Sequence, residues 1–193
     1  SYNLDLRMMG ERCCRGLFNE KSAGTDVSVL EGVMGLFDGN ISSSASTLNT
    51  LGVPCVLIVD ARSCAESAVA VVNGFISYDD TKIAGVIFNR IGSDRHRDLI
   101  EREMKKRIQL PVFGYVYRDS VFEIPSRHLG LHMGSEVKST KKRVKRLAEK
   151  IETYIDLPSL LSLACPSQVK RQQEEKKNDS IPGAGKKTIA IAR

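Results

Sequence analysis

A carboxylate followed by three closely spaced glycines is the feature of this chain best suited to chemistry. Residues 31–39 read Glu-Gly-Val-Met-Gly-Leu-Phe-Asp-Gly and follow the short apolar run 27–30. Such a run is typical of a buried parallel strand, and ligands of doubly wound sheets bind outside the carboxyl ends of the strands. We therefore expect Glu31 to face that crevice, where glycines let the backbone approach a bulky or phosphorylated ligand. A turn that merely joins a strand to a helix is the alternative.

Two carboxylates of this segment are candidate ligands for Mg²⁺. Glu31 offers a hard oxygen ligand at the predicted strand end, and Asp38 lies within the same loop. Mg²⁺ is usually held by one or two carboxylates together with the phosphates of a nucleotide. The alternatives are a solvent-exposed loop carboxylate for Glu31 and a cap of the next turn for Asp38.

Asn89 is the candidate for recognising a nucleotide base. It ends the apolar run 83–89, and its amide presents a donor and an acceptor side by side, as reading the edge of adenine requires. Asp60 ends the preceding run and faces the same predicted crevice, although an N-cap of the following helix explains it equally well. For Asn89 the alternative is a role in the turn before Gly92.

Several basic and imidazole side chains follow the predicted strands and are candidates for binding anions. Arg95 and His96 could contact a phosphate or a substrate carboxylate, although a lone histidine after a turn is more often a polar cap. A second group surrounds Pro125 and consists of Arg118, Asp119, Arg127 and His128. Arginine forks bind carboxylates and phosphates in a bidentate manner. The alternative for this group is an ion network between Arg118 and Asp119 on the surface.

The elements that must position these side chains are predicted from a regular alternation along the chain. Apolar, β-branched runs recur at 27–31, 54–60, 83–89 and 111–116, and helical stretches lie between them at 43–51, 63–77 and 94–107. This alternation is typical of successive βαβ units, which form a parallel sheet covered on both faces. The expected fold class is therefore α/β, with a doubly wound, mostly parallel sheet. Serines at 42–44, Ser63 and Ser93 are expected to begin the three helices.

The net charge of +6 comes largely from one basic segment, residues 138–150, in which Glu149 is the single acid. Apolar residues from Val144 to Tyr154 recur there at helical spacing, so we expect an amphipathic helix at 139–154 with one dry face. A solvated basic face is the favoured interpretation, and binding of a polycarboxylate substrate or of nucleic acid is the alternative. No aromatic residues interleave with the charges as a stacking platform requires, so we expect no nucleic-acid partner.

Composition indicates a soluble globular protein. Of the 193 residues 41% are hydrophobic and 27% are charged, which is typical of such proteins, and no apolar run is long enough to span a bilayer. The five cysteines are scattered without the spacing of a metal site. Buried thiols such as Cys55 and Cys64 fit a reducing compartment, so we expect a cytoplasmic protein with no membrane partner.

Several ordered motifs, over roughly residues 2–165, resemble the cobyrinic acid a,c-diamide synthase family. The glycine-rich segment 29–39 is similar to the family's signature. Further similar segments are Asn3-Leu-Asp-Leu-Arg-Met-Met9, Pro54–Ala61, Ile83–Ser93 with Arg95-His96, Tyr117-Arg-Asp119 and Ile124–Leu131. Two positions depart from the family's usual residues: Tyr117 stands where Pro is usual, and Ser44 stands where Thr is usual.

The resemblance implies a fold, an activity and a set of roles. The fold would be like that of P-loop NTPases and dethiobiotin synthetase, and the enzyme would be a glutamine-dependent carbon–nitrogen ligase of cobalamin biosynthesis. A second copy of the chain, in a homodimer, is a further partner to be expected. ATP would phosphorylate a side-chain carboxylate of cobyrinic acid, and ammonia made from glutamine would displace the phosphate. Glu31 would be catalytic and would hold Mg²⁺ together with Asp38. Asn89, Arg118 and Asp119 would bind ATP, and the substrate would contact Ser44, Arg95, His96, Arg127 and His128.

The resemblance also implies an incomplete domain organisation. A P-loop reads Gly-x-x-x-x-Gly-Lys-Ser/Thr after a strand, and nothing before residue 31 fits; residues 183–188 fail because Lys187 stands at the Ser/Thr position. We expect a partial synthetase domain at 1–165, a charged linker at 166–187 and the start of a glutaminase domain at 188–193. Without the phosphate-cradling loop, this chain alone is expected to be inactive.

Other classes of function remain open. The nearest alternative is a sister amidase that acts on another metal-tetrapyrrole. A second is a nucleotide-fold module without a P-loop that binds a partner and performs no chemistry. A third is a relative of partition ATPases on a membrane surface, which would require an apolar face that residues 168–187 do not have.

Overall fold

The computed structural model describes residues 2–122 and 140–164, with the side chains of residues 140–143 excepted. The elements along the chain are α1 (Leu6–Ser22), the short 3-10 helix η1 (Asn40–Ser42), α2 (Ser44–Leu51), β1 (Cys55–Asp60), α3 (Glu66–Tyr78), β2 (Ile83–Ile91), α4 (Asp94–Arg107), β3 (Val112–Tyr117), the short 3-10 helix η2 (Ser120–Phe122), α5 (Thr140–Glu152) and α6 (Leu157–Ser162).

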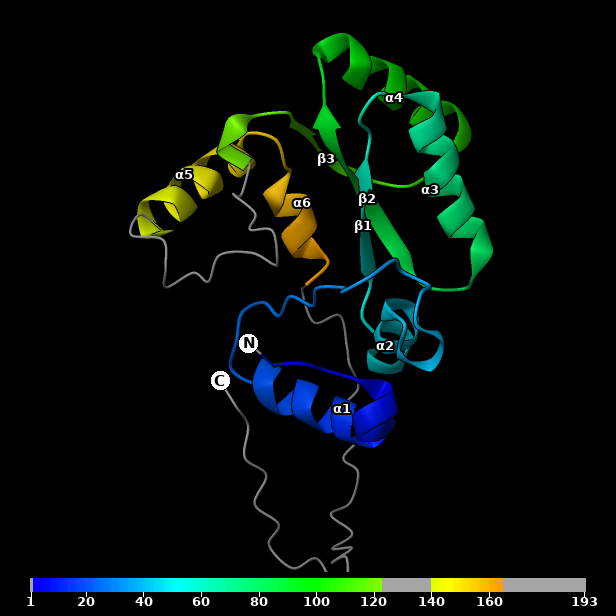
Figure 1. Ribbon diagram of the computed structural model, residues 1–193, viewed down its shortest axis with the longest axis vertical. Coiled ribbons are helices and arrows are strands. Elements are labelled where there is room, and N and C mark those ends of the chain that lie inside the picture. Colours follow the sequence, from blue (N-terminus) through cyan, green and yellow to red (C-terminus); the bar gives the residue numbers. More distant parts are fainter. Residues whose placement is uncertain (1, 123–139, 165–193) are drawn as a thin grey trace, which may run out of the picture.

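A parallel three-stranded sheet with helices on both faces forms the centre of the molecule. The strand order is β1-β2-β3, and both neighbouring pairs are parallel. Figure 1 shows α3 and α4 on one side of the sheet and α5 and α6 on the other. The α/β prediction is therefore confirmed, and three of the four predicted strands and all three predicted intervening helices are present.

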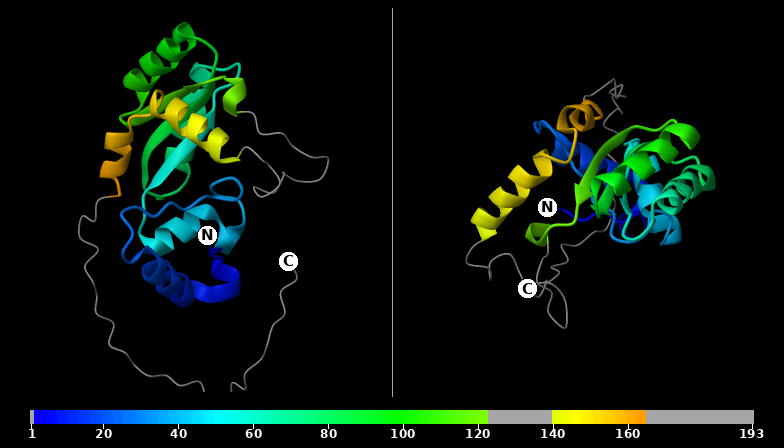
Figure 2. Two further views of the ribbon diagram at one scale, coloured as in Figure 1. Left: turned by 90° about the vertical axis from the view of Figure 1, so that its left-hand side faces the viewer. Right: turned by 90° about the horizontal axis from the view of Figure 1, so that it is seen from above.

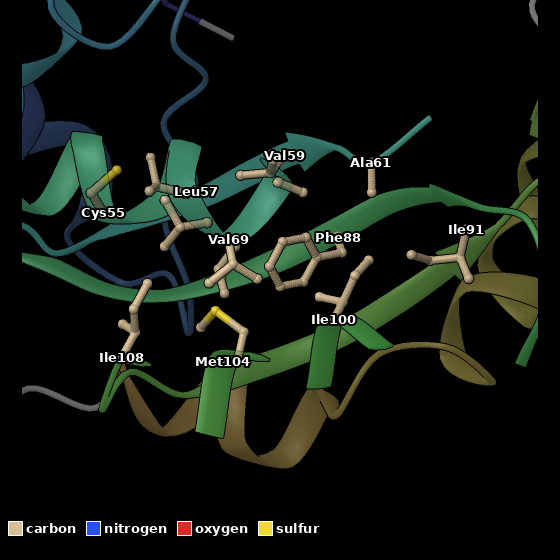
Figure 3. Close-up of a cluster of buried hydrophobic side chains, with 13 residues drawn as sticks. Cys55, Leu57, Val59, Ala61, Val69, Phe88, Ile91, Ile100, Met104 and Ile108 are labelled. Carbon is tan, nitrogen blue, oxygen red and sulfur yellow. The ribbon is translucent and has the colours of Figure 1, made fainter. Parts of the chain in front are cut away.

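The larger core lies between the sheet and the pair α3 and α4 (Figure 3). Val86 and Phe88 of β2 are completely buried there, as are Val72 of α3 and Ile100 of α4. These side chains alternate along β2 and recur at helical spacing along the helices, which is why the two periods of the sequence predict the elements correctly.

The opposite face of the sheet carries a smaller core. Ile87, Phe113 and Val116 pack there against residues from α5 and α6. The turn after α5 also pairs with the outer edge of β3, because the Tyr115 amide donates to the Tyr154 carbonyl at 3.1 Å. A Cβ on Gly114 would lie 2.5 Å from that same carbonyl oxygen, so this close approach requires glycine.

Capping residues set where two of the predicted helices begin. Ser43 accepts a hydrogen bond from the Ser46 amide at the start of α2, and Ser93 accepts one from the His96 amide at the start of α4, as predicted. The predicted start of the middle helix at Ser63 is wrong, because α3 begins at Glu66. Ser63 instead has a φ of 62° and forms a tight turn.

The predicted strand at 27–31 is absent, which corrects the sequence analysis. The segment has no regular secondary structure and pairs with no strand that the structure describes, and Val29 is 88% exposed. An apolar alternation becomes a strand only where a neighbouring backbone satisfies its N–H and C=O groups. Met8 is likewise 85% exposed on α1.

The segment 2–54 surrounds one end of the sheet. Figures 1 and 2 show α1 and α2 beyond the end at which β1 begins, which is the amino edge of the sheet. Among the described helices, none is both long enough and apolar enough to be a membrane span.

Candidate functional site

Polar side chains gather where the three strands end, at the carboxyl edge of the sheet. Asp60 ends β1, and Asn89 lies beside it two residues before the end of β2, since the two are partners in the register of the strands. Arg118 follows the last residue of β3, and its amide donates to the carbonyl of Ile91 at 3.0 Å. The structure thus brings the predicted base-reading residue and a predicted phosphate-binding arginine to the same edge.

Arg90 connects these strand ends, although the sequence analysis did not single it out. Its guanidinium donates to Asp60 Oδ2 at 2.8 Å, and its carbonyl oxygen accepts from Arg118 Nε at 3.3 Å. The alternative role proposed for Asp60, an N-cap of the next helix, is not observed. Its other carboxylate oxygen accepts from the amide of Arg62 in the turn after β1.

The backbone at Arg90 is in the left-handed region, with a φ of 62°. This conformation is uncommon for a residue other than glycine and clusters at functional sites. It interrupts the pairing of β2 with β3 between Asn89 and Ile91. The Arg90 amide then donates to Asn89 Oδ1 at 2.8 Å.

Asn89 keeps the groups that reading a base requires. Its carboxamide oxygen has two lone pairs, of which the Arg90 amide uses one. Within the part of the chain that the structure describes, its Nδ2 group donates to no partner. The side chain is half-buried and its oxygen is held by the Arg90 amide. Among the described residues, both Nδ2 donors and one lone pair of the oxygen have no partner, so they suit a ligand.

His96 lies at this edge but has no free ring nitrogen. Its Nδ1 accepts from the amide of Gly92 at 3.1 Å, and its Nε2 lies 2.7 Å from the carbonyl oxygen of Cys64. Both bonds are to backbone groups, so the alternative of a polar cap describes this geometry better than a contact to a substrate carboxylate.

Arg95 remains available for an anion. It is exposed in the first turn of α4, where the unsatisfied N–H groups of a helix favour negative charge. Asp94, in the same turn, accepts a hydrogen bond of 2.5 Å from the Tyr117 hydroxyl. Tyr117 thereby joins the end of β3 to the start of α4, a contact that the proline usual in the resembling family would not make.

Asp119 performs a structural task in the described part of the chain. It accepts from the Val121 amide at 2.9 Å and lies 3.3 Å from Lys150 Nζ. The Val121 hydrogen bond, and after it Lys150, lower the pKa of the Asp119 carboxyl below its ordinary value. The alternative for this group, an ion network between Arg118 and Asp119, is not seen among the described residues, and Asp119 instead links the start of η2 to α5. Arg127 and His128, which were also predicted to contact substrate, lie outside the described residues.

The glycine-rich loop lies at the other edge of the sheet, which contradicts the predicted position of Glu31. Phe37 stacks against Phe75 and Tyr78 near the end of α3, and the carbonyl of Leu36 accepts from Ala45 in α2. The end of α3 precedes β2, so these contacts belong to the amino edge. β1 has six residues, and about 3.3 Å per residue separates the two edges by about 20 Å.

Glu31, Asp38 and Ser44 therefore form a group apart from Asn89. A Cβ on Gly32 would lie 2.7 Å from Ser44 Oγ, so the loop touches the start of α2. Glu31 and Asp38 are both exposed. The predicted position of Glu31 is wrong because the segment before it pairs with no described strand. A parallel strand places its last residue at the carboxyl edge only when it is paired within the sheet.

These residues do not fit a magnesium site that also serves a nucleotide on Asn89. Among the described residues, no group of three or more His, Cys, Asp or Glu side chains is arranged to hold a metal ion. Glu31 and Asp38 also face solvent at the edge opposite to the base-reading candidate. The magnesium role implied by the resemblance is thus without support in the geometry of this chain.

The sequence offered only weak signals for the residues that were missed. Arg90 and Tyr117 immediately follow or precede candidate residues, but their contacts reach 30 and 23 residues along the chain. The spacing of residues predicts which side chains are neighbours within one helix or strand. It does not predict contacts between the ends of different strands.

Comparisons with known proteins agree with the architecture. The profile described as the CobQ/CobB/MinD/ParA nucleotide binding domain matches residues 17–131. Relatives named cobyrinate a,c-diamide synthase include one from Caldanaerobacter subterraneus subsp. tengcongensis, 40% identical over 100% of this chain and 43% of the relative. That of Salmonella typhimurium is 36% identical over 100% of this chain and 43% of the relative. That of Methanocaldococcus jannaschii is 35% identical over 85% of this chain and 39% of the relative.

The resemblance seen in the motifs is therefore confirmed across the chain. The chain spans less than half the length of these relatives. No solved structure matches the chain.

Proposed function

The chain belongs to the CobQ/CobB/MinD/ParA family of nucleotide-binding domains, and on that premise we propose that it serves an ATP-dependent amidation of cobyrinic acid. The proposed reaction converts the a- and c-side-chain carboxylates to carboxamides in cobalamin biosynthesis, with ammonia derived from glutamine. It rests on the relatives named cobyrinate a,c-diamide synthase, which match this chain at 35–42% identity. We place this reaction in the cytoplasm.

One observation carries the proposal: the half-buried Asn89, held by its own neighbour at the carboxyl edge of a parallel sheet, beside Arg118 and the start of α4. Ligands of open α/β sheets bind outside this edge. A carboxamide with one free donor and one free acceptor suits the edge of adenine. Arg118, Arg95 and the first-turn amides of α4 are cations and dipoles that suit phosphate.

In the proposed reaction a substrate carboxylate oxygen attacks the γ-phosphorus of ATP, and the bond from that phosphorus to the bridging oxygen breaks to release ADP. Ammonia then attacks the carbonyl carbon of the acyl phosphate, loses a proton, and inorganic phosphate leaves. Phosphoryl transfer asks a protein mainly to position the groups and to neutralise charge. Asn89 would fix the base, and Arg118 and Arg95 would lie on the charged part of the nucleotide or on substrate carboxylates.

Other assignments stay predictions carried by the resemblance. A requirement for Mg²⁺ is one of them, although Glu31 and Asp38 do not fit its site beside Asn89, and no step of the reaction above depends on it. Contacts of Ser44, Arg127 and His128 with cobyrinic acid are others, as is the supply of ammonia by a glutaminase domain. Asp119 binds Lys150, so in the proposal it supports the edge and does not touch the nucleotide.

The test is an amidation assay with the protein expressed from its complete reading frame. We expect ADP to form only when cobyrinic acid is present, and the product to show two successive mass changes, each from a carboxylate to a carboxamide. Replacing glutamine with ammonium salts separates the amidation from the supply of ammonia. ATP binding without turnover, under conditions that support a known relative, would contradict the proposal and favour a non-catalytic nucleotide-binding module. Turnover of a different tetrapyrrole acid alone would identify a sister amidase.

A further inference from the structure

We propose that the imidazole of His96 is a positioning residue that ties two loops together and thereby holds Asn89 and Arg118 in the geometry for nucleotide binding. The two loops are the turn between β1 and α3 and the turn between β2 and α4. This inference rests on the proposed function for its kinetic consequences, but its structural part does not depend on any ligand.

The hydrogen bonds of the ring define a single tautomer. Nδ1 accepts from the Gly92 amide at 3.1 Å, so that nitrogen carries no proton. Nε2, which lies 2.7 Å from the Cys64 carbonyl oxygen, must then carry the proton and donate it. Two backbone groups 28 residues apart in sequence are thus bridged by one neutral ring, since residues 64 and 92 belong to different βα turns.

On one side the bridge leads to Arg118. Gly92 directly follows Ile91, whose carbonyl accepts from the Arg118 amide, and Arg118 Nε donates to the carbonyl of Arg90. A Cβ on Gly92 would lie 3.9 Å from Arg118 Nη2 and 3.7 Å from His96 Nδ1. The guanidinium therefore packs against the same short backbone segment that the imidazole holds.

On the other side the bridge leads to Asn89. Cys64 closes a turn in which its amide donates to the Ala61 carbonyl at 3.2 Å, and the Ala61 amide donates to the Asn89 carbonyl at 2.9 Å. The ion pair of Asp60 with Arg90 joins the same two strands, next to the hydrogen bond between Ala61 and Asn89. These hydrogen bonds form a closed circuit, by which we mean a continuous set of contacts that joins the ends of β1, β2 and β3. The His96 ring completes it by binding the turn after β1 and the turn after β2.

Backbone conformation supports a holding role. Ser63 and Arg90 both have a φ of 62°, and each lies within two residues of a group bonded by this circuit. Non-glycine residues keep such a conformation only where the surroundings determine it. His96 itself is fixed by the Ser93 cap, which binds its amide at 3.2 Å. Both ring nitrogens are used by backbone groups, so His96 would affect ligand binding by holding the two loops in place and not by touching the ligand.

Two substitutions separate the two bonds. In His96→Asn the side-chain oxygen occupies the place of Nδ1 and keeps the Gly92 acceptor, but it does not reach Cys64. In His96→Gln the terminal amide occupies the place of Nε2 and keeps the Cys64 donor, but the Gly92 amide loses its acceptor. His96→Ala removes both, and Arg102→Gln, exposed on the same helix, is the matched control.

The kinetic readout uses the protein expressed from its complete reading frame. We expect His96→Ala to raise the KM for ATP about tenfold and each single-bond variant about threefold, as expected for one or two lost hydrogen bonds. The kcat at saturating ATP and the KM for cobyrinic acid should stay within about twofold of the wild type, because the ring is not expected to touch the reacting atoms. A rise confined to the KM for cobyrinic acid would overturn the inference and restore a substrate contact.

A ligand-free readout separates this inference from the proposed function. Nitrogen chemical shifts should identify His96 as the Nε2–H tautomer, and hydrogen exchange should show the Gly92 amide protected in the wild type and in His96→Asn. Protection should be lost in His96→Gln and His96→Ala but kept in Arg102→Gln. If the bridge is seen and the wild type neither binds nor turns over ATP, the proposed function fails and so does the kinetic role. If ATP is turned over and Gly92 exchanges equally in every variant, the inference alone fails.

Discussion

The two edges of the sheet differ in how their polar residues are held. At the carboxyl edge Asp60, Arg90, Arg118 and His96 are connected across three strands by hydrogen bonds. At the amino edge the glycine-rich loop makes local turns, and Glu31 is exposed. The stretch with the most recognisable sequence is thus the less organised in this chain. Motif strength and structural preorganisation are separate properties, and only the second can be read from contacts.

Apolar exposure points to the same difference. Val33 is 95% exposed in the glycine-rich loop, whereas Ile91 at the end of β2 is completely buried. Exposed apolar side chains contribute little to stability. The carboxyl edge holds the candidate ligand-binding side chains, whereas the glycine-rich loop is held by its backbone turns. We therefore expect substitutions at the carboxyl edge to change ligand binding, and substitutions that strain the backbone of the amino-edge loop to change local stability alone.

The largest effect is expected at Asn89. Asn89→Ala in the protein from the complete reading frame should weaken ATP binding by about 1–3 kcal/mol, the usual cost of losing a good paired contact to a base. Discrimination against GTP should fall as well, because the free donor and acceptor are removed together. Michaelis constants for ATP and GTP are the measurement. An unchanged preference for ATP over GTP would assign Asn89 to the turn before Gly92 instead.

A stability effect is expected at Gly39, which has a φ of 105° before η1. Gly39→Ala should lower the free energy of unfolding by about 1–2 kcal/mol, because a Cβ is strained in left-handed backbone. The KM for ATP should not change. Denaturant unfolding and ATP kinetics on the same preparation provide the check, with Gly16→Ala, where a Cβ meets open space, as control. If Gly39→Ala also raised the KM for ATP, the amino edge would contribute to nucleotide binding and the proposed difference between the two edges would be wrong.

A pH effect is expected from the link between Asp119 and Lys150. The Val121 hydrogen bond and Lys150 hold the pKa of Asp119 below its ordinary value of 3.8. A carboxyl whose pKa is lowered on folding stabilises the protein above its unfolded pKa and loses that contribution as the pH falls through the folded pKa. Asp119→Asn should therefore be less stable than the wild type at pH 7, and the difference should begin to shrink as the pH falls below about 4, toward the lowered pKa of Asp119. Unfolding curves from pH 3 to pH 7 measure the difference in the free energy of unfolding between the two proteins. If that difference stays constant down to pH 3, it comes from packing and not from the charge of Asp119.

The smallest effect is expected at Glu31. Because the glycine-rich loop lies at the edge of the sheet opposite to Asn89, Glu31→Gln should change ATP affinity by less than about twofold in magnesium-free buffer. Calorimetric titration with ATP and EDTA measures this, with Asn89→Ala as the comparison. A loss as large as that of Asn89→Ala would show that the glycine-rich loop joins the nucleotide site, as the family resemblance implies.

Much of the fold could be predicted because its signals are local. The apolar run 83–89 forms most of β2, in which residues 85–88 are all buried, and Ser43 and Ser93 cap the helices that follow them. In both cases the residue and its partner lie within one element, where the period of the backbone decides which side chains meet. The run at 27–31 carries the same local signal and fails, because pairing requires a neighbour that local sequence does not specify.

The candidate site was predicted in part for the same reason. The positions of Asn89 and Arg118 at strand ends follow from the βαβ alternation, and the structure places both at the carboxyl edge. The distance of Glu31 from them does not follow, nor does the use of both His96 nitrogens by backbone groups. Each depends on contacts between segments far apart in the chain.

The sequence by itself determined the three parallel strands, the helices α2, α3, α4 and α5, and the family, because periodicity and motifs are properties of short segments. Only the tertiary structure decided that Arg90 pairs with Asp60, that His96 bridges two turns, and that the glycine-rich loop lies at the opposite edge. These are outcomes of packing, in which the partner of a side chain is whichever group the fold brings within about 3 Å.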